Sequence, residues 1–249
     1  MPEETRISRR EKEREGQREA LLERWVPKTI IGKKVKSGEI TSIDEIIKSE
    51  QKILESEIID KLLPNLEVEL LSVGQSKGKF GGGKKSIWKQ TQKKTKEGNK
   101  PRFSALAVVG NRNGYVGLGY GTAKETLPAR EKATRQAKLN LISIRRGCGS
   151  WACGCKTPHS IPYAVTGKNG SVKVKIMPAP RGTHLTINKE CQKILRLAGI
   201  SDVYSKSRGQ TRTAYNLLLA CFKALKSLNK MKISEDQLGT LKVLEGTAA

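Results

Sequence analysis

The sequence predicts an α+β fold in two domains. One pattern behind this prediction is a β-hairpin over residues 102–121 followed by a helical stretch. Another is a run from 160 to 230 in the order strand, strand, helix, strand, helix. At 249 residues the chain is also long enough for two modest domains with tails.

The hairpin has an unusual second strand. Residues 103–109 are rich in apolar and β-branched residues, and the Asn-Gly pair at 113–114 is a strong turn signal because both residues tolerate positive φ. Gly117, Gly119 and Gly121 leave one face of the return strand almost without side chains. We therefore expect a packed helix or a nucleic-acid backbone to approach that face closely. A dinucleotide-binding fingerprint is excluded, because the spacing is G-x-G-x-G and no parallel βαβ unit follows.

Shorter elements surround the hairpin, and capping patterns or prolines mark their ends. The predicted elements of the first domain are helices at Ser42–Ile47 and Ser56–Leu63, a strand at Leu66–Val73, the hairpin, and a helix capped by Thr126 that runs to about Asn140. This order predicts a three-stranded antiparallel sheet with a helix on one face.

The second domain is predicted as a two-layer ββαβα sandwich. Its predicted elements are strands at Ser160–Val165 and Ser171–Met177 joined by a turn at Gly167–Gly170, a helix from Asn188 to Gly199, a strand at Asp202–Ser205, and a helix at Thr213–Lys230. Helical spacing of the apolar residues puts Cys191 and Cys221 on buried stripes, so both are expected in the core.

Composition divides the chain into six segments. They are a charged tail at 1–24, a helical segment at 25–65, the first domain at 66–142, a cysteine-rich connector at 143–159, the second domain at 160–230, and a polar tail at 231–249 that predicts no element. The first twenty residues are charged throughout and resemble no signal peptide. A cytoplasmic protein without disulfides is therefore expected.

The charge balance points to a polyanionic partner. The chain has 48 Lys and Arg against 24 Asp and Glu, a net charge of +24. That balance is atypical of a soluble enzyme and favours nucleic acid. A membrane surface is disfavoured, because no apolar run approaches a spanning length. Since only 4% of residues are aromatic, backbone and groove contacts are expected rather than base stacking.

Residues 74–100 form a very basic stretch, expected to be one long loop within the first domain. The stretch contains nine lysines and a single acid, Glu97. A solvated, self-repelling linker is one interpretation. Lysines that neutralise RNA phosphates are the other, and we favour it because joining two strands needs only a few residues.

A candidate metal site lies in the connector. Cys148, Cys153, Cys155 and His159 fall in one glycine-containing segment, and Cys₃His is an established structural zinc set. The spacing C-x₄-C-x-C-x₃-H differs from the common C-x₂-C knuckle, so an ordinary loop with a surface histidine is the alternative. A bound Zn²⁺ would stiffen the connector between the domains.

No catalytic constellation accompanies these features. His184 stands alone and is interpreted as a phosphate contact or a surface residue. The carboxylates are not paired beside loop histidines, and no Gly-rich phosphate loop with Ser/Thr and Lys occurs. The protein is therefore predicted not to be an enzyme. A metal-dependent nucleic-acid enzyme is disfavoured because a second metal-competent set is absent.

Three motifs carry a resemblance to a known family. VVGNRNGYVGLGYG at 108–121, LNLISIRRG at 139–147 and MPAPRG at 177–182 occur in the order found in the ribosomal protein five family of the small subunit. The chain resembles that family from about 25 to 228, and its cysteine-rich segment resembles the archaeal branch.

The resemblance implies a double-stranded-RNA-binding-like N-terminal domain (α-β-β-β-α) followed by the ββαβα domain. It also implies a structural role on small-subunit rRNA in assembly, decoding accuracy and the mRNA entry path, beside ribosomal protein four of the small subunit. A free-standing regulator that binds double-stranded or structured RNA is the alternative.

The candidate RNA-binding residues come from two sources. The basic stretch and a basic turn supply some of them through their charge. The resemblance supplies the hairpin tip, Arg145, Arg146 and Arg181. Together they are Lys84, Lys85, Lys89, Lys93, Lys94, Lys96, Lys100, Arg102, Asn111, Arg112, Asn113, Arg145, Arg146, Arg181, Arg208 and Arg212.

Overall fold

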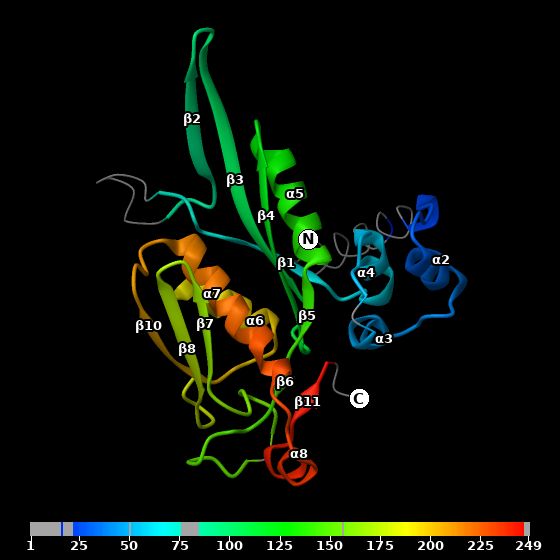
Figure 1. Ribbon diagram of the computed structural model, residues 1–249, viewed down its shortest axis with the longest axis vertical. Helices are drawn as coiled ribbons and strands as arrows, with labels where there is room; N and C mark the ends of the chain where they lie inside the picture. The colour runs from blue at the N-terminus through cyan, green and yellow to red at the C-terminus, as the bar shows by residue number, and fades with distance from the viewer. Residues whose placement is uncertain (1–15, 17–21, 50, 76–84, 156, 247–249) are drawn as a thin grey trace, which may run out of the picture. The chain divides into compact units, whose positions relative to one another are not determined.

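The computed structural model describes residue 16 and residues 22–49, 51–75, 85–155 and 157–246 (Figure 1). The chain divides into two compact units, 1–64 and 65–249. None of the described helices combines the length and the apolar character that a membrane span requires.

The N-terminal unit is helical. It contains α2 (Ile30–Ser37), α3 (Ile43–Lys48) and α4 (Ser56–Leu62), and both predicted helices are confirmed. As expected, Ser42 caps α3, its Oγ accepting a hydrogen bond from the Asp44 N–H at 3.2 Å. Helix α2 was not predicted, although Thr29 caps its start and a left-handed Gly38 ends it.

The first sheet of the second unit is larger than predicted. It contains β1 (Glu67–Leu71), β2 (Lys89–Thr95), β3 (Gly98–Gly110), β4 (Tyr115–Ala123) and β5 (Leu141–Ser143). The order is β1-β3-β4-β5, and β2 also pairs with β3. The predicted strand at Leu66–Val73, the hairpin and the helix are confirmed. That helix, α5 (Thr126–Leu139), starts at Thr126 itself, and Glu125 is its N-cap residue.

Helix α5 occupies the bare face of the glycine-rich strand. A Cβ at Gly119 would overlap the backbone N of Ala137 and the carbonyl O of Ala133. Gly117 and Gly121 meet the same helix in the same way. The helix, rather than a nucleic acid, is therefore what the glycines admit.

The prediction of one structureless loop at 74–100 is wrong for residues 89–100, and residues 76–84 lie outside the described residues. Strand β2 pairs with β3 from Lys89 opposite Ser104 to Thr95 opposite Gly98. Strand β4 pairs with β3 only from Phe103 onward. The end of the β2–β3 hairpin is therefore a two-stranded ribbon, which extends past β4 and α5 (Figure 1). Lysine-rich strands lack the apolar alternation by which strands are recognised, so the ladder was not visible in the sequence.

The second sheet contains the three predicted strands, with shifted boundaries, and a short fourth strand at Leu185–Thr186 that was not predicted. It contains β7 (Val165–Asn169), β8 (Val172–Pro178), β9 (Leu185–Thr186) and β10 (Val203–Arg208), in the order β7-β8-β10-β9. Helices α6 (Lys189–Leu197) and α7 (Ala214–Ser227) complete the layer pair. Asn188 caps α6, and Gly199 follows it with φ 79°, as predicted.

Two predicted boundaries of that sheet are wrong. Its first strand is 165–169 rather than 160–165, and Gly167 belongs to the strand. A Cβ at Gly167 would overlap the Ala220 carbonyl of α7, so this glycine is needed for close packing and not for a turn. Strand β10 also continues to Arg208, which was expected in a turn.

One hydrophobic core joins the two predicted domains. Leu106, Val116 and Leu118 from the first sheet belong to the same buried cluster as Ile176 and Leu218 from the second. Cys191 and Cys221 are also in it and are fully buried, as expected.

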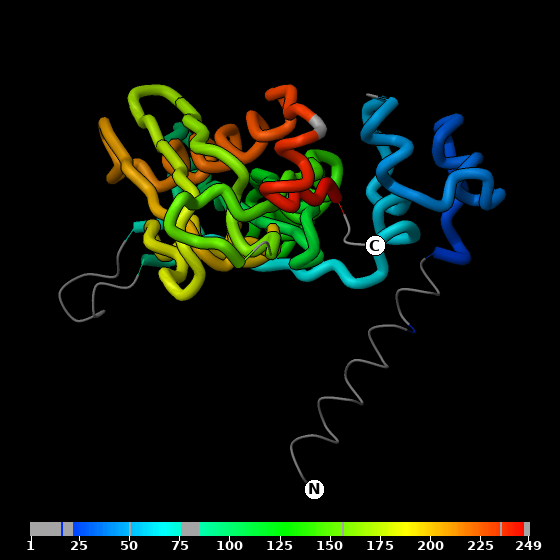
Figure 2. Tube along the Cα trace, turned by 90° about the horizontal axis from the view of Figure 1, so that it is seen from below, coloured from blue at the N-terminus to red at the C-terminus, as the bar shows by residue number. Residues whose placement is uncertain are grey.

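The C-terminal tail is structured, contrary to the prediction of no element there. It forms α8 (Glu235–Leu241) and β11 (Leu244–Glu245), and β11 pairs with β6 (Arg145–Arg146). The tail lies along the cysteine-rich connector (Figure 2), where the Cys148 N–H donates to the Leu241 carbonyl at 2.9 Å. Strand β11 could not be predicted from a local pattern, because its pairing partner β6 is distant in sequence.

The contact between α5 and β4 leads to a stability prediction. Gly119→Ala should destabilise the protein by about 1–3 kcal/mol, because the added methyl must displace helix backbone. Urea unfolding followed by circular dichroism measures this. Gly239→Ala on α8 is the control, since a Cβ there has no neighbour within 4 Å and alanine favours helix. Equal unfolding midpoints for the two variants would contradict this account of the packing.

Candidate metal centre and nucleic-acid interface

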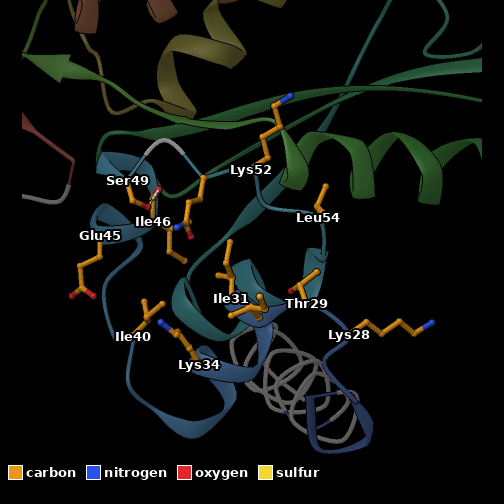
Figure 3. Close-up of a pocket in the computed structure, with 12 residues that line it drawn as sticks. Lys28, Thr29, Ile31, Lys34, Ile40, Glu45, Ile46, Ser49, Lys52 and Leu54 are labelled. Atoms are coloured by element: carbon orange, nitrogen blue, oxygen red, sulfur yellow. Dashed lines mark hydrogen bonds between the residues drawn. The ribbon is translucent and has the colours of Figure 1, made fainter.

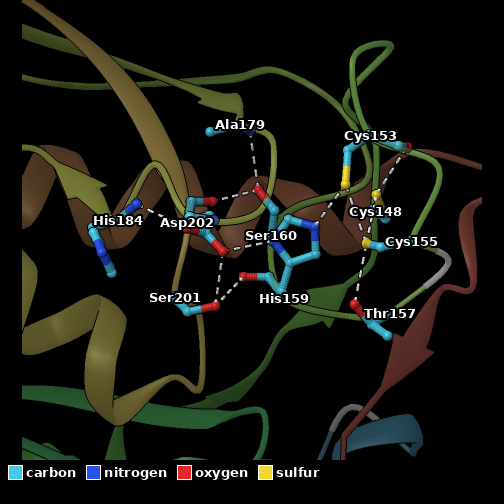
Figure 4. A network of polar contacts seen from close by, with 11 residues as sticks. Cys148, Cys153, Cys155, Thr157, His159, Ser160, Ala179, His184, Ser201 and Asp202 are labelled. Carbon is cyan, nitrogen blue, oxygen red and sulfur yellow. Dashed lines mark hydrogen bonds and ion pairs between the residues drawn. The ribbon is translucent and has the colours of Figure 1, made fainter.

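The structure brings the four predicted metal ligands together. One ligand atom each from Cys148, Cys153, Cys155 and His159 lies within 4.8 Å of all the others (Figure 4). The backbone closes this loop through a β-bridge between Gly147 and Ser160. Of the four residues, Cys148 is buried and the others are half-buried.

The spacing of these atoms suits a tetrahedral ion. Cys155 Sγ lies 3.2 Å from Cys153 Sγ and 3.6 Å from Cys148 Sγ, and His159 Nε2 lies 3.8 Å from Cys153 Sγ. Sulfurs bound at about 2.3 Å to a tetrahedral zinc ion lie roughly 3.8 Å apart, so little movement would be needed to close the site.

The thiols of the cluster have divergent acidities. Burial, followed by contact with the neighbouring thiols, raises the pKa of Cys148 to about 11. Hydrogen bonds from the Thr157 hydroxyl and backbone lower the pKa of Cys155 to about 6. Crowded thiolates repel one another, and a divalent cation at their centre would stabilise all of them in the charged form.

Asp202 orients the histidine of the cluster. Its carboxylate is almost fully buried, and its Oδ2 accepts from His159 Nδ1 at 2.8 Å (Figure 4). Burial raises the pKa of Asp202, but hydrogen bonds from the backbone of His184 and the ring of His159 outweigh it and hold that pKa below its usual value. With the Nδ1 proton held by Asp202, the lone pair of His159 is on Nε2, which faces the thiols.

The other oxygen of Asp202 holds the turn that follows the MPAPRG motif. Its Oδ1 accepts from the Gly182 N–H at 3.1 Å and from the His184 N–H at 2.8 Å. His184, which was expected to be a phosphate contact or a surface residue, is exposed, with φ 59°. Sequence reasoning missed Asp202 because it lies far from the cluster in the chain.

The basic ribbon carries most of its cations on one face. Residues paired directly across a ladder point to the same side of it. Lys93 is opposite Lys100, and Lys89 and Arg102 lie on the same side as this pair. All four side chains are exposed, as are Lys85, Lys94 and Lys96. Lys84 lies outside the described residues.

The predicted hairpin tip is held by internal contacts. Asn111 Oδ1 accepts from the N–H groups of Asn113 and Tyr115 at 2.8 and 3.1 Å. Arg112 has φ 56° and an exposed side chain that forms an ion pair with Glu67 at 2.8 Å.

Arg145 and Arg146 are tied into the fold. Arg145 forms an ion pair with Glu245 and donates to the Met231 carbonyl. Arg146 is only 6% exposed, and its Nη2 donates to Asn113 Oδ1 at 2.6 Å. Burial also lowers the pKa of Arg146. These two guanidinium groups therefore hold the hairpin tip and the C-terminal tail, and no local pattern in the sequence signalled those partners.

Other predicted cations lie at the surface of the second half. Arg181, Arg208 and Arg212 are all exposed. Sequence reasoning did not single out the lysines of strands β7, β8 and β10. The signal was present as the alternation Val172-Lys-Val-Lys-Ile176, which is typical of a strand with one buried and one open face.

A separate pocket lies in the N-terminal unit. It has a volume of about 680 Å³ and is lined by aliphatic side chains together with Lys28, Lys34, Lys52 and Glu45 (Figure 3). Among its lining residues, Glu45 has no histidine, cysteine or second carboxylate beside it. The pocket therefore offers no general acid–base pair.

The chain matches known proteins along most of its length. The family model for the N-terminal domain of ribosomal protein S5 matches residues 87–145, and that for its C-terminal domain matches residues 167–237. A small ribosomal subunit protein uS5 from Nanoarchaeum equitans is 50% identical over 85% of this chain and 91% of the relative. The protein of the same name from Methanocaldococcus jannaschii is 49% identical over 90% of this chain and 97% of the relative. The chain belongs to the ribosomal protein S5 family.

Proposed function

We propose that the protein is a structural rRNA-binding component of the small ribosomal subunit. The observation that carries the proposal is the identity of about half the residues to archaeal proteins named for that subunit, over nearly their whole length. The net charge of +24 supports it, because a polyanionic partner is needed. The protein acts by position and charge, not by catalysis, and its place is the cytoplasmic ribosome.

The first sheet with helix α5 is the part proposed to act as a double-stranded-RNA-binding-like domain. The ribbon formed by β2 and the start of β3 reaches the RNA. Its cations neutralise phosphates and do not recognise the base sequence, because side chains cannot reach the base edges in the deep, narrow major groove of A-form RNA. Within the subunit, the protein adjoins ribosomal protein four and the mRNA entry path, and contributes to decoding accuracy.

Co-sedimentation tests this function. The tagged full-length chain, expressed in an archaeal host, should sediment with small subunits and remain bound after a moderately high-salt wash. Release of the protein by that wash, with small subunits intact, would favour the free-standing RNA-binding regulator.

The ribbon leads to a salt-dependence prediction. The triple variant Lys93→Gln, Lys100→Gln, Arg102→Gln should reduce the slope of log affinity against log salt by about 2 to 3 for an in vitro transcript of archaeal small-subunit rRNA, because each lost phosphate contact removes roughly one. Filter binding across a salt series measures the slope.

The control for the ribbon removes the same charge elsewhere. Lys226, Lys230 and Lys232 are exposed at and beyond the end of α7, and changing all three to Gln should lower the slope by less than about 1. If the ribbon and control variants give equal slopes, the ribbon is not a specific phosphate contact.

We further propose that Cys148, Cys153, Cys155 and His159 hold a structural Zn²⁺. The close approach of four suitable ligand atoms supports this, as does the orientation of His159 by a buried carboxylate. The ion would fix the connector against the C-terminal tail, since Cys148 and Leu241 are already joined through their backbones. It has no open coordination position and so supplies no catalytic chemistry.

The metal site leads to an affinity prediction. Asp202→Asn should weaken Zn²⁺ binding about 10- to 100-fold, because an amide facing Nδ1 favours the tautomer whose proton sits on Nε2. Chelator competition on the full chain measures the affinity, and the ¹⁵N shifts of the His159 ring report the tautomer. Asp236→Asn, an exposed site on α8, is the matched control.

The outcomes separate two failures. A wild-type chain that binds no zinc and has freely reactive thiols would refute the proposed metal site itself. Zinc bound equally tightly by the wild type and by Asp202→Asn would refute only the proposed orienting role of Asp202.

A further inference from the structure

The second sheet has one covered face and one open face. Its inward residues, among them Val165, Val174, Ile176 and Val203, are buried in the core with helices α6 and α7. Side chains alternate between the two faces of a strand. The residues between these buried positions therefore point away from the helices, and they are exposed.

The open face carries a cluster of five cationic side chains. We call it the basic sheet face and define it by Lys168 on β7, Lys173 and Lys175 on β8, and Lys206 and Arg208 on β10. In the strand register, Lys173 lies directly opposite Lys168 on one side and Arg208 on the other. Lys175 lies directly opposite Lys206. The five cations thus form two rows across the sheet.

These cations lack a counter-charge within the described part of the chain. None of the five forms an ion pair there. The remaining outward positions on the same strands are Thr166, Met177 and Tyr204, so the face holds no carboxylate. Like charges directly opposite each other destabilise a ladder. Repulsion between these cations therefore destabilises the free protein, and a polyanion bound across the sheet would relieve it.

The dimensions of the face match a nucleic-acid backbone. Neighbouring strands lie about 5 Å apart, and alternate residues repeat roughly every 7 Å along a strand. A row of three cations therefore spans about 10 Å. An open sheet surface fits the wide, shallow minor groove and flanking phosphates of A-form RNA better than a narrow cleft would.

We propose that the basic sheet face is a second RNA-binding surface, which grips the phosphate backbone of structured RNA. This proposal rests on the rRNA-binding function proposed above, and it adds a surface on the second sheet to the ribbon of the first. The two surfaces belong to one unit with a shared core. The protein thereby holds two RNA segments at a fixed separation.

A second triple variant tests this surface. Lys173→Gln, Lys175→Gln, Lys206→Gln in the full chain should lower the salt slope for the same rRNA transcript by about 2 to 3. Its thermal midpoint should equal or exceed that of the wild type, because repulsion across the ladder is relieved. The Lys226, Lys230, Lys232 triple again controls for net charge alone.

Combining the variants distinguishes this proposal from the earlier one. If the surfaces act independently, the sheet and ribbon triples should lower the slope additively. A sheet triple with the slope of the control, alongside an effective ribbon triple, overturns the second surface and leaves the proposed function standing. A wild type with no affinity for the transcript above that for polyglutamate overturns both.

Discussion

The direct contact between helix α5 and the backbone of strand β4 is the constraint on which the rest of the larger unit depends. The helix presents a stripe of buried alanines to a strand that presents glycines, so the two backbones approach without intervening side chains. By strand alternation, the residues between these glycines lie on the opposite face of the sheet. There Val116 and Leu118 join the core that includes α6 and α7. Small residues on one side of the sheet thus allow two predicted domains to share a single interior.

The shared interior is closed by backbone hydrogen bonds at the hairpin tip. The N–H groups of Arg112 and Gly114 donate to the carbonyls of Leu197, the last residue of α6, and Ala198, its C-cap, at 2.9 and 3.2 Å. These carbonyls have no partner within the helix, so the tip caps it. Arg146 fills the space behind the tip, and the C-terminal tail covers Arg146. The tip is therefore a structural joint, whatever its exposed Arg112 contacts.

How far the sequence predicted the fold depended on how local each signal was. Asn188 and Gly199 act on their own neighbours, and their predictions were confirmed. The hairpin at the Asn-Gly pair was also confirmed, although its residues with positive φ are Arg112 and Gly114. The ribbon was not visible because its strands are stabilised by a ladder and not by an apolar face. The prediction for Gly167 was wrong because a glycine that lets a helix pack closely cannot be distinguished in the sequence from a glycine in a turn. Tertiary packing decided each of these cases.

The same distinction applies to the candidate sites. The four metal ligands lie close together in the chain, so their cluster could be predicted, whereas Asp202 reaches His159 only through the fold. Arg145 and Arg146 entered the RNA-binding candidates through the resemblance, and their structural partners, Glu245 and Asn113, could not be predicted because they are distant in sequence. Charge alone could not tell an arginine that faces RNA from one that holds the tail.

The placement of acids explains why the basic surfaces remain unneutralised. Within the described chain, several carboxylates have internal structural partners: Glu55 holds Trp25 and the start of α2, Glu190 holds the Ser72 N–H, Asp202 holds His159, and Glu245 holds Arg145. Carboxylates engaged in this way do not neutralise the ribbon or the basic sheet face. Within the described chain, Lys100 of the ribbon forms an ion pair with Glu97 at 2.8 Å. The other exposed cations that define the two surfaces form no ion pair there and keep their field toward solvent, at a cost in repulsion that a phosphate backbone would remove. The internal use of acids and the external excess of bases are two results of one distribution of charge, and that distribution suits a protein that is completed by RNA.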